Sequence, residues 1–128
     1  MKTINNGNKE TTVHEQDQFL WGDNEFETGT LTIASGDEAA DGTILVRDGT
    51  SGKFKVASAI DSPVFVLVDR GTYSAAGDYP VRVAVSGKFN RARLFLKGSA
   101  LTAANADALR GYGILALSSK NYGSADNK

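Results

Sequence analysis

Few side chains of this 128-residue chain are of a type and spacing that could do chemistry. The one histidine, His14, lies in a polar stretch with nothing beside it to hold the ring, and a Ser-His-Asp triad would require that residue. The chain has no cysteine, which excludes a thiolate nucleophile, a disulfide and a thiolate metal site. Asp37, Glu38 and Asp41 lack the alternating oxygen ligands of a calcium loop. We therefore expect no catalytic residue, no metal site and no cofactor.

Motifs for phosphate or sugar chemistry are also missing. The glycine-rich stretches 49–52 and 111–113 lack the Lys-Ser/Thr ending of a P-loop, and neither matches the dinucleotide fingerprint. Glu25 and Glu27 would share one face of a strand, but nothing around them is typical of a sugar-binding cleft. The sequence therefore predicts a protein that is not an enzyme.

The charge is unevenly distributed, although the formal net charge is only −1. Residues 1–42 hold nine acids and two bases, and residues 43–128 hold twelve bases and six acids. Five cations, which we call the basic strip, fall within a stretch of sixteen residues that contains no acid: Arg82, Lys88, Arg91, Arg93 and Lys97. The strip is either a solvated strand face or a surface for an acidic partner.

Two aromatic residues lie among these cations and suggest an alternative function. Phe89 and Phe95 alternate with Arg91 and Arg93, a pattern similar to a strand platform on which nucleic-acid bases stack. The alternative interpretation is therefore a small nucleic-acid-binding β-barrel that uses the basic strip from Arg82 to Lys97.

The two ends of the chain are polar. Residues 1–18 have only Ile4 and Val13 as aliphatic side chains after Met1, so they cannot bury enough apolar area to order alone, and we predict a flexible N-terminal arm. The apolar Phe19-Leu20-Trp21 follows it. Trp21 is either a lid on the domain's own core or an anchor that docks on a partner. Residues 118–128 are predicted to be a polar tail.

Between these ends the pattern is that of short strands separated by glycine-rich turns. Leu31 and Ile33 alternate with threonines, and Gly22-Asp23-Asn24 is typical of a turn. The predicted strands are 30–33, 44–46, 54–56, 64–68, 81–85, 94–96 and 114–117. A helix is predicted over 103–110, with Thr102 as N-cap and Gly111 ending it in a left-handed conformation.

These elements predict a mainly β fold over residues 19–117, a small β-rich barrel or tulip-like domain with one short C-terminal helix. No apolar run approaches the ~18 residues of a membrane span, so no membrane partner is expected.

Several segments, in order, resemble the lambda-type head decoration (capsid cement) proteins of tailed bacteriophages. They are Phe19–Asp23, Thr32–Gly36, Asp41–Leu45, Gly52–Phe54, Val66–Asp69, Tyr79–Val83, Gly87–Asn90, Leu109-Arg110 and Gly113-Ile114. The resemblance covers about residues 19–117. Lys88 departs from the pattern, because the family usually has an acid there, and Arg91 and Arg93 add further positive charge.

The resemblance implies a structural virion protein, made in the host cytoplasm, that binds the outer surface of the expanded head and stabilises it against internal DNA pressure. Its implied partners are the major capsid protein and itself, as a homotrimer at local threefold positions, with no direct nucleic-acid contact. We expect the capsid-binding residues to be Val13 of the arm and Phe19, Leu20 and Trp21 at its base. The basic strip would then face the capsid or a neighbouring subunit.

Overall fold

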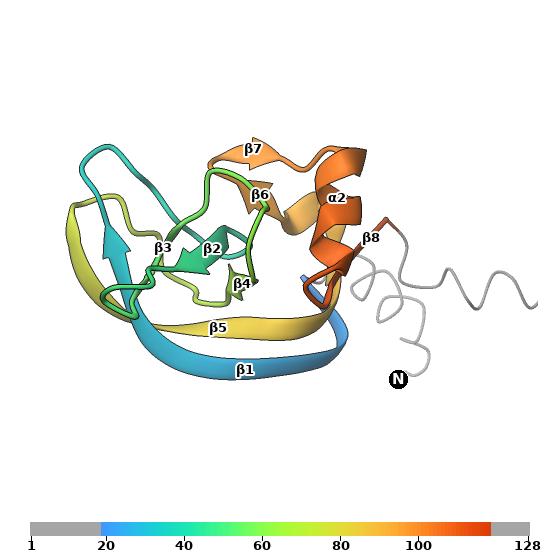
Figure 1. The fold of residues 1–128 in the computed structure, drawn as a ribbon, viewed down its shortest axis with the longest axis horizontal. Coiled ribbons are helices and arrows are strands. Elements are labelled where there is room, and N and C mark those ends of the chain that lie inside the picture. The colour runs from blue at the N-terminus through green and yellow to red at the C-terminus, as the bar shows by residue number, and fades with distance from the viewer. Residues whose placement is uncertain (1–18, 119–128) are drawn as a thin grey trace, which may run out of the picture.

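Five strands close into a small barrel in the computed structural model, which describes residues 19–118 (Figure 1). The strands are β1 (Leu20–Ile33), β2 (Ile44–Arg47), β3 (Phe54–Val56), β4 (Val64–Leu67) and β5 (Gly77–Asn90). Their order is β1-β3-β2-β4-β5, and β5 pairs again with β1, so the ring is closed. This confirms the predicted mainly β barrel. The predicted arm with Val13, and the tail after Ser118, lie outside the described residues.

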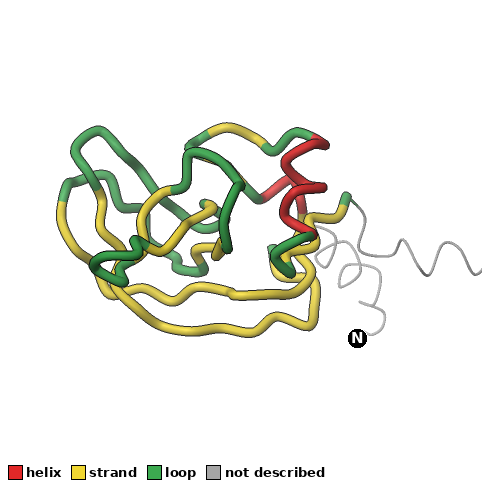
Figure 2. Tube along the Cα trace, in the orientation of Figure 1, coloured by secondary structure: helices red, strands yellow, loops and turns green. Residues whose placement is uncertain are grey.

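The two longest strands, β1 and β5, run antiparallel along one side of the body (Figure 2). Their register is unbroken from Phe26 opposite Ala84 to Ile33 opposite Gly77, and three register shifts interrupt it between Leu20 and Phe26. The turn predicted at residues 22–24 is therefore wrong, because these residues form an irregular part of β1 and the strand continues through them.

Side chains that alternate along the strands fill the inside of the barrel. Leu31 and Ile33 are buried as predicted, and β4 lies between β2 and β5 as the predicted central strand. One core cluster gathers around Phe89 and Leu109, and a second gathers around Leu31 and Phe54. The barrel is thus packed along its whole length.

Short elements follow β5 and cover one end of the barrel. They are the 3₁₀ turn η1 (Arg91–Arg93), β6 (Phe95–Leu96), β7 (Ser99–Ala100), α2 (Ala103–Arg110) and β8 (Ile114–Leu117). Strands β6 and β7 pair as a hairpin, Phe95 of β6 also forms a parallel bridge to Thr43, and β8 pairs in parallel with β5. Within residues 19–118, no helix is long and apolar enough to cross a bilayer.

The short C-terminal helix has the predicted bounds and N-cap. The Thr102 hydroxyl accepts a hydrogen bond from the Asn105 N–H at 3.1 Å. The predicted left-handed Gly111 is wrong, because its φ of −65° is right-handed. The chain keeps turning through three further backbone hydrogen bonds, and Gly113, with φ +85°, makes the left-handed reversal into β8.

Candidate functional site

The two described chain ends leave the barrel at one place. Phe89 of β5 lies opposite Leu20 of β1 on one side and opposite Ala116 of β8 on the other. Because neighbouring strands are about 4.8 Å apart, Leu20 and Ala116 are separated by about 10 Å. We call this part of the barrel the terminal end (Figure 1). Any segment that precedes residue 19 or follows residue 118 therefore starts there.

The residues expected at the base of the arm are placed at this terminal end. Phe19 is half-buried, with its ring centroid 5.7 Å from that of Phe89, and its carbonyl accepts a hydrogen bond from the Asn90 N–H at 2.9 Å. Leu20 packs against the same core cluster. Trp21 is only 7% exposed, which favours its interpretation as a lid on the domain's own core.

The residues of the basic strip contact different parts of the molecule. The Arg82 guanidinium lies 3.9 Å from the ring centroid of Phe26, and the Lys88 ammonium is 3.3 Å from the Asp23 carboxylate. Arg82, Arg91 and Lys97 line three different hollows. The structure therefore does not gather the strip around one site.

The predicted stacking platform for nucleic-acid bases is wrong. Phe89 is 0% exposed and lies in the core between β1 and β8, so its ring cannot meet a base. Arg91 and Arg93 belong to a 3₁₀ turn instead of a strand, so they do not share a strand face with Phe95. Alternation in the sequence suggested one strand through these residues, but β5 ends at Asn90.

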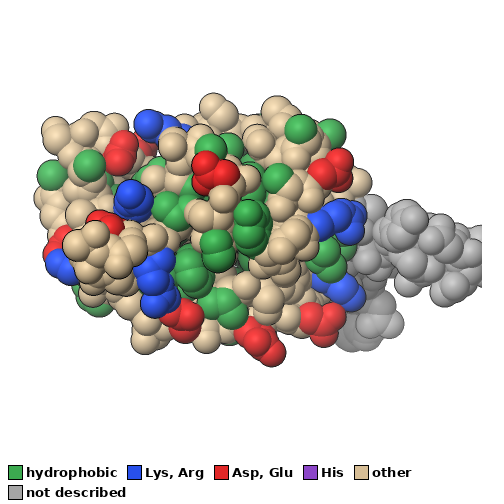
Figure 3. Space-filling model, in the orientation of Figure 1, with side chains coloured by type: hydrophobic (Ala, Val, Ile, Leu, Met, Phe, Trp, Pro, Cys, Tyr) green, Lys and Arg blue, Asp and Glu red, His purple; other side chains and the backbone are tan. Residues whose placement is uncertain are grey.

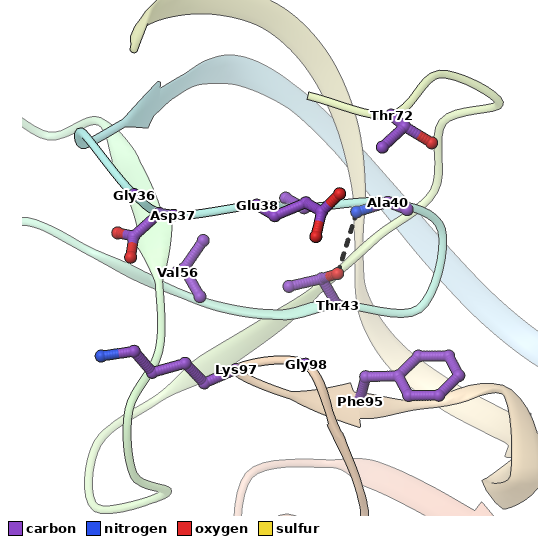
Figure 4. A pocket seen from close by; sticks show the side chains of 11 residues that line it. Gly36, Asp37, Glu38, Ala40, Thr43, Val56, Thr72, Phe95, Lys97 and Gly98 are labelled. Carbon is purple, nitrogen blue, oxygen red and sulfur yellow. Dashed lines mark hydrogen bonds between the residues drawn. The ribbon is translucent and has the colours of Figure 1, made fainter. Parts of the chain in front are cut away.

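A hollow of about 470 Å³ opens between the loop at residues 36–40 and the β6–β7 hairpin (Figure 4). The carboxylates of Asp37 and Glu38 lie on one wall and Lys97 on the other, and the Thr43 hydroxyl accepts a hydrogen bond from the Ala40 N–H at 3.0 Å. No group of three or more potential metal ligands occurs among the residues that the structure describes. The hollow thus has charged walls and, in the described part of the chain, no arrangement typical of catalysis.

A carboxylate network joins two loops beside Phe19 and Leu20. The Asp69 N–H donates to the Asp41 carboxylate, and the Asp69 carboxylate accepts from the Tyr73 hydroxyl at 2.9 Å. Burial raises the pKa of Asp41, and the nearby Asp69 charge adds to this effect. Burial and the hydrogen bond to Asp69 likewise raise the pKa of Tyr73. Sequence reasoning missed the network, because Asp41 and Asp69 are 28 residues apart and only the strand order brings them together.

A groove at the terminal end was also missed. It is a hollow of about 500 Å³ between α2 and the end of β8, and it is lined by Arg91, Ala103, Ala106, Asp107, Arg110, Ala116, Leu117 and Ser118. We call it the α2–β8 groove. Figure 3 shows basic side chains on the surface at this end of the body. The sequence signal for this groove is the position of Arg110. It is the last residue of the helix and comes just before the last predicted strand.

Comparison with protein families assigns most of the chain to a known family. Residues 8–116, which are more than half of the chain, match the family model described as bacteriophage lambda head decoration protein D. No curated protein matches the chain.

Proposed function

Because the chain belongs to the bacteriophage lambda head decoration protein D family, and is thus a component of the phage capsid, we propose that it binds the outer surface of the expanded head. There it stabilises the shell against the pressure of packaged DNA. A protein that binds the assembled lattice better than loose subunits stabilises the lattice by mass action.

The observation that carries this proposal is the common exit of both chain ends beside Phe89, together with a family match that begins at residue 8. The terminal end then faces the shell, and residues 1–18 act as an arm that adds a strand to a sheet edge of the major capsid protein. Such pairing uses main-chain hydrogen bonds and needs little particular sequence. In this proposal residues 19–117 are the body and 118–128 a tail.

One arm alone binds weakly, because the segment loses conformational entropy when it orders. A homotrimer at local threefold positions presents three arms at once, and the raised effective concentration increases avidity by roughly 10²–10⁴. Val13 contributes from the arm, and Phe19, Leu20 and Trp21 fix the base of the arm against the body.

Deletion of residues 1–18 tests the arm. We expect the shortened protein to keep its thermal unfolding midpoint and to lose binding to purified expanded heads in a cosedimentation assay. Unchanged affinity would overturn the arm's role. His14→Pro sharpens the test, because proline removes a backbone donor from an added strand, whereas the matched His14→Ala keeps it. We expect only the proline variant to lose binding.

Trp21→Ala separates the two roles of the tryptophan. A core lid predicts a loss of about 3–5 kcal/mol from the free energy of unfolding of the free protein. An anchor predicts a loss of head affinity with little change in stability. The burial of Trp21 leads us to expect the first result.

Electron density for trimers on decorated heads tests the proposed assembly.

A further inference from the structure

We infer that the α2–β8 groove receives an extended acidic segment of the shell protein, which pairs as an added strand with the free edge of β8. This inference rests on the proposed function and names a second contact between the body and the shell, separate from the arm. The described groove residues supply three features that such a segment needs: cations, an apolar lining and an open strand edge.

The cations are Arg91 and Arg110, and the groove has one acid, Asp107. Neither arginine has an ion-pair partner between residues 19 and 118, and the Arg91 side chain donates a long hydrogen bond, 3.5 Å from Nη2 to the Leu101 carbonyl. Arginine forms bidentate hydrogen bonds to carboxylates, so two guanidinium groups without an ion-pair partner in residues 19–118 match a segment with at least two acids.

The apolar lining of the groove comes from both α2 and β8. Ala103 and Ala106 of α2 face Ala116 and Leu117 of β8 across it. Ala106 and Ala116 are buried in the core cluster that also holds Leu109, so the walls are held in place by the body. A volume of about 500 Å³ accommodates a few residues of an extended chain.

The strand edge is the outer side of β8. This strand pairs with β5 on one side, and no strand of the described chain pairs with its other side. An unpaired edge presents a row of N–H and C=O groups that another chain can satisfy. Four residues, Ile114–Leu117, span about 13 Å, which is enough for a short added strand.

The chain's own ends are the other candidates for the groove. The arm contains Glu10, Glu15 and Asp17, but it continues into β1, which lies on the opposite side of β5 from β8. Residues 119–128 contain two lysines and one aspartate and so carry no excess of acid. A neighbouring acidic polypeptide remains the occupant that the charge and the topology favour.

The test uses full-length protein and purified expanded heads that lack the decoration protein. The double variant Arg91→Glu/Arg110→Glu is compared with the matched Lys53→Glu/Lys55→Glu, which makes the same charge change beside and within β3, outside both the groove and the basic strip. We expect at least about tenfold weaker head binding for the groove variant and less than about a twofold change for the control. Arg110→Glu alone provides a milder variant, since no described residue is hydrogen-bonded to its side chain.

Hydrogen exchange supplies the second readout, since an added strand protects backbone amides of β8. We expect slower exchange at residues 114–117 in head-bound wild type than in the free protein. Equal affinity of wild type and groove variant, or equal losses in both double variants, would overturn the inference while leaving the proposed function intact. Faster exchange of β8 in the free protein after deletion of residues 1–18 would show that the arm occupies the edge, and would also overturn it. Failure of wild type to bind heads would instead contradict the proposed function.

Discussion

The two ends of the β1–β5 ribbon are built differently. Towards Ile33 and Gly77 the ladder is regular, and β3 closes the ring beside it. Towards Leu20 and Phe89 the ladder is broken by three register shifts, and β8 is added as an extra strand. The regular end is held by buried alternating side chains, whereas the terminal end depends on special backbone geometry and on side chains that bond to backbone.

The two ends of the ribbon also differ in the interactions of their charged side chains. At the regular end, the Asp78 carboxylate meets both the Lys53 ammonium and the Thr32 hydroxyl at 2.7 Å. At the terminal end, Arg91 and Arg110 have no ion-pair partner in residues 19–118. Lys88 and Asp23 do form an ion pair at the terminal end, so the difference between the two ends is confined to the two arginines of the α2–β8 groove. Three substitutions test how differently the two ends are built.

The largest effect is expected from Gly87→Ala at the terminal end. Gly87 has a φ of +118°, and a Cβ there would lie 2.7 Å from the Asp23 carbonyl oxygen and 2.8 Å from the Asn24 Cα, both of which are backbone atoms. We expect a loss of about 3 kcal/mol in the free energy of unfolding, measured by urea denaturation. The matched Gly49→Ala meets no atom within 4 Å and should change it by less than about 0.5 kcal/mol. Similar losses for the two variants would contradict a special backbone requirement at Gly87.

An intermediate effect on the free energy of unfolding is expected from Asn24→Ala. The Asn24 carboxamide accepts from the Gly22 N–H and donates to the Lys88 carbonyl, each at 3.1 Å, so it joins the irregular part of β1 to β5. Removing it should lower the free energy of unfolding by about 1–2 kcal/mol. It should also speed hydrogen exchange at the terminal end only. Glu25→Ala, an exposed neighbour, is the control, and uniform acceleration along the whole ribbon would argue against a local clamp.

The smallest effect is expected from Asp78→Asn at the regular end. Hydrogen bonds from Lys53 and Thr32 hold the pKa of Asp78 below its ordinary 3.8. The charged form therefore stabilises the fold above about pH 3.8, and that contribution is lost as the pH falls through the lower folded-state pKa. The stability difference between wild type and variant should be largest near neutral pH and should vanish in strong acid. It should be small, because the side chain is 46% exposed. A difference that grows on acidification would refute this sign.

Local patterns predicted most of the elements. Alternation identified the strand at Leu31, short apolar runs identified those at Ile44, Val64 and Ile114, and capping residues identified the helix. The failures were non-local. Gly22-Asp23-Asn24 is typical of a turn, yet the hydrogen bond of Asn24 to Lys88, 64 residues away, keeps the chain in the strand. The parallel pairing of Leu31 with Phe54, which closes the ring, has no signal in the sequence.

The candidate site was harder to predict for the same reason. The basic strip is continuous in the sequence, but β5 ends at Asn90 and sends the later cations to other surfaces. The neighbouring positions of Leu20 and Ala116 depend on two strands that meet the same residue of β5. Family resemblance supplied the function, which the side-chain chemistry alone did not indicate.

The position of Leu20 at the start of the fourteen-residue β1 has a mechanical consequence. The hydrogen bonds from β1 to β5 run across the strands, so a tensile force applied to residue 20 in the direction of β1 would be perpendicular to them. Such a force loads the β1–β5 hydrogen bonds in shear. Many of these hydrogen bonds then share the force, and they do not break one after another. Under the proposed function, a body tethered in this way would resist being pulled from the shell when the shell expands.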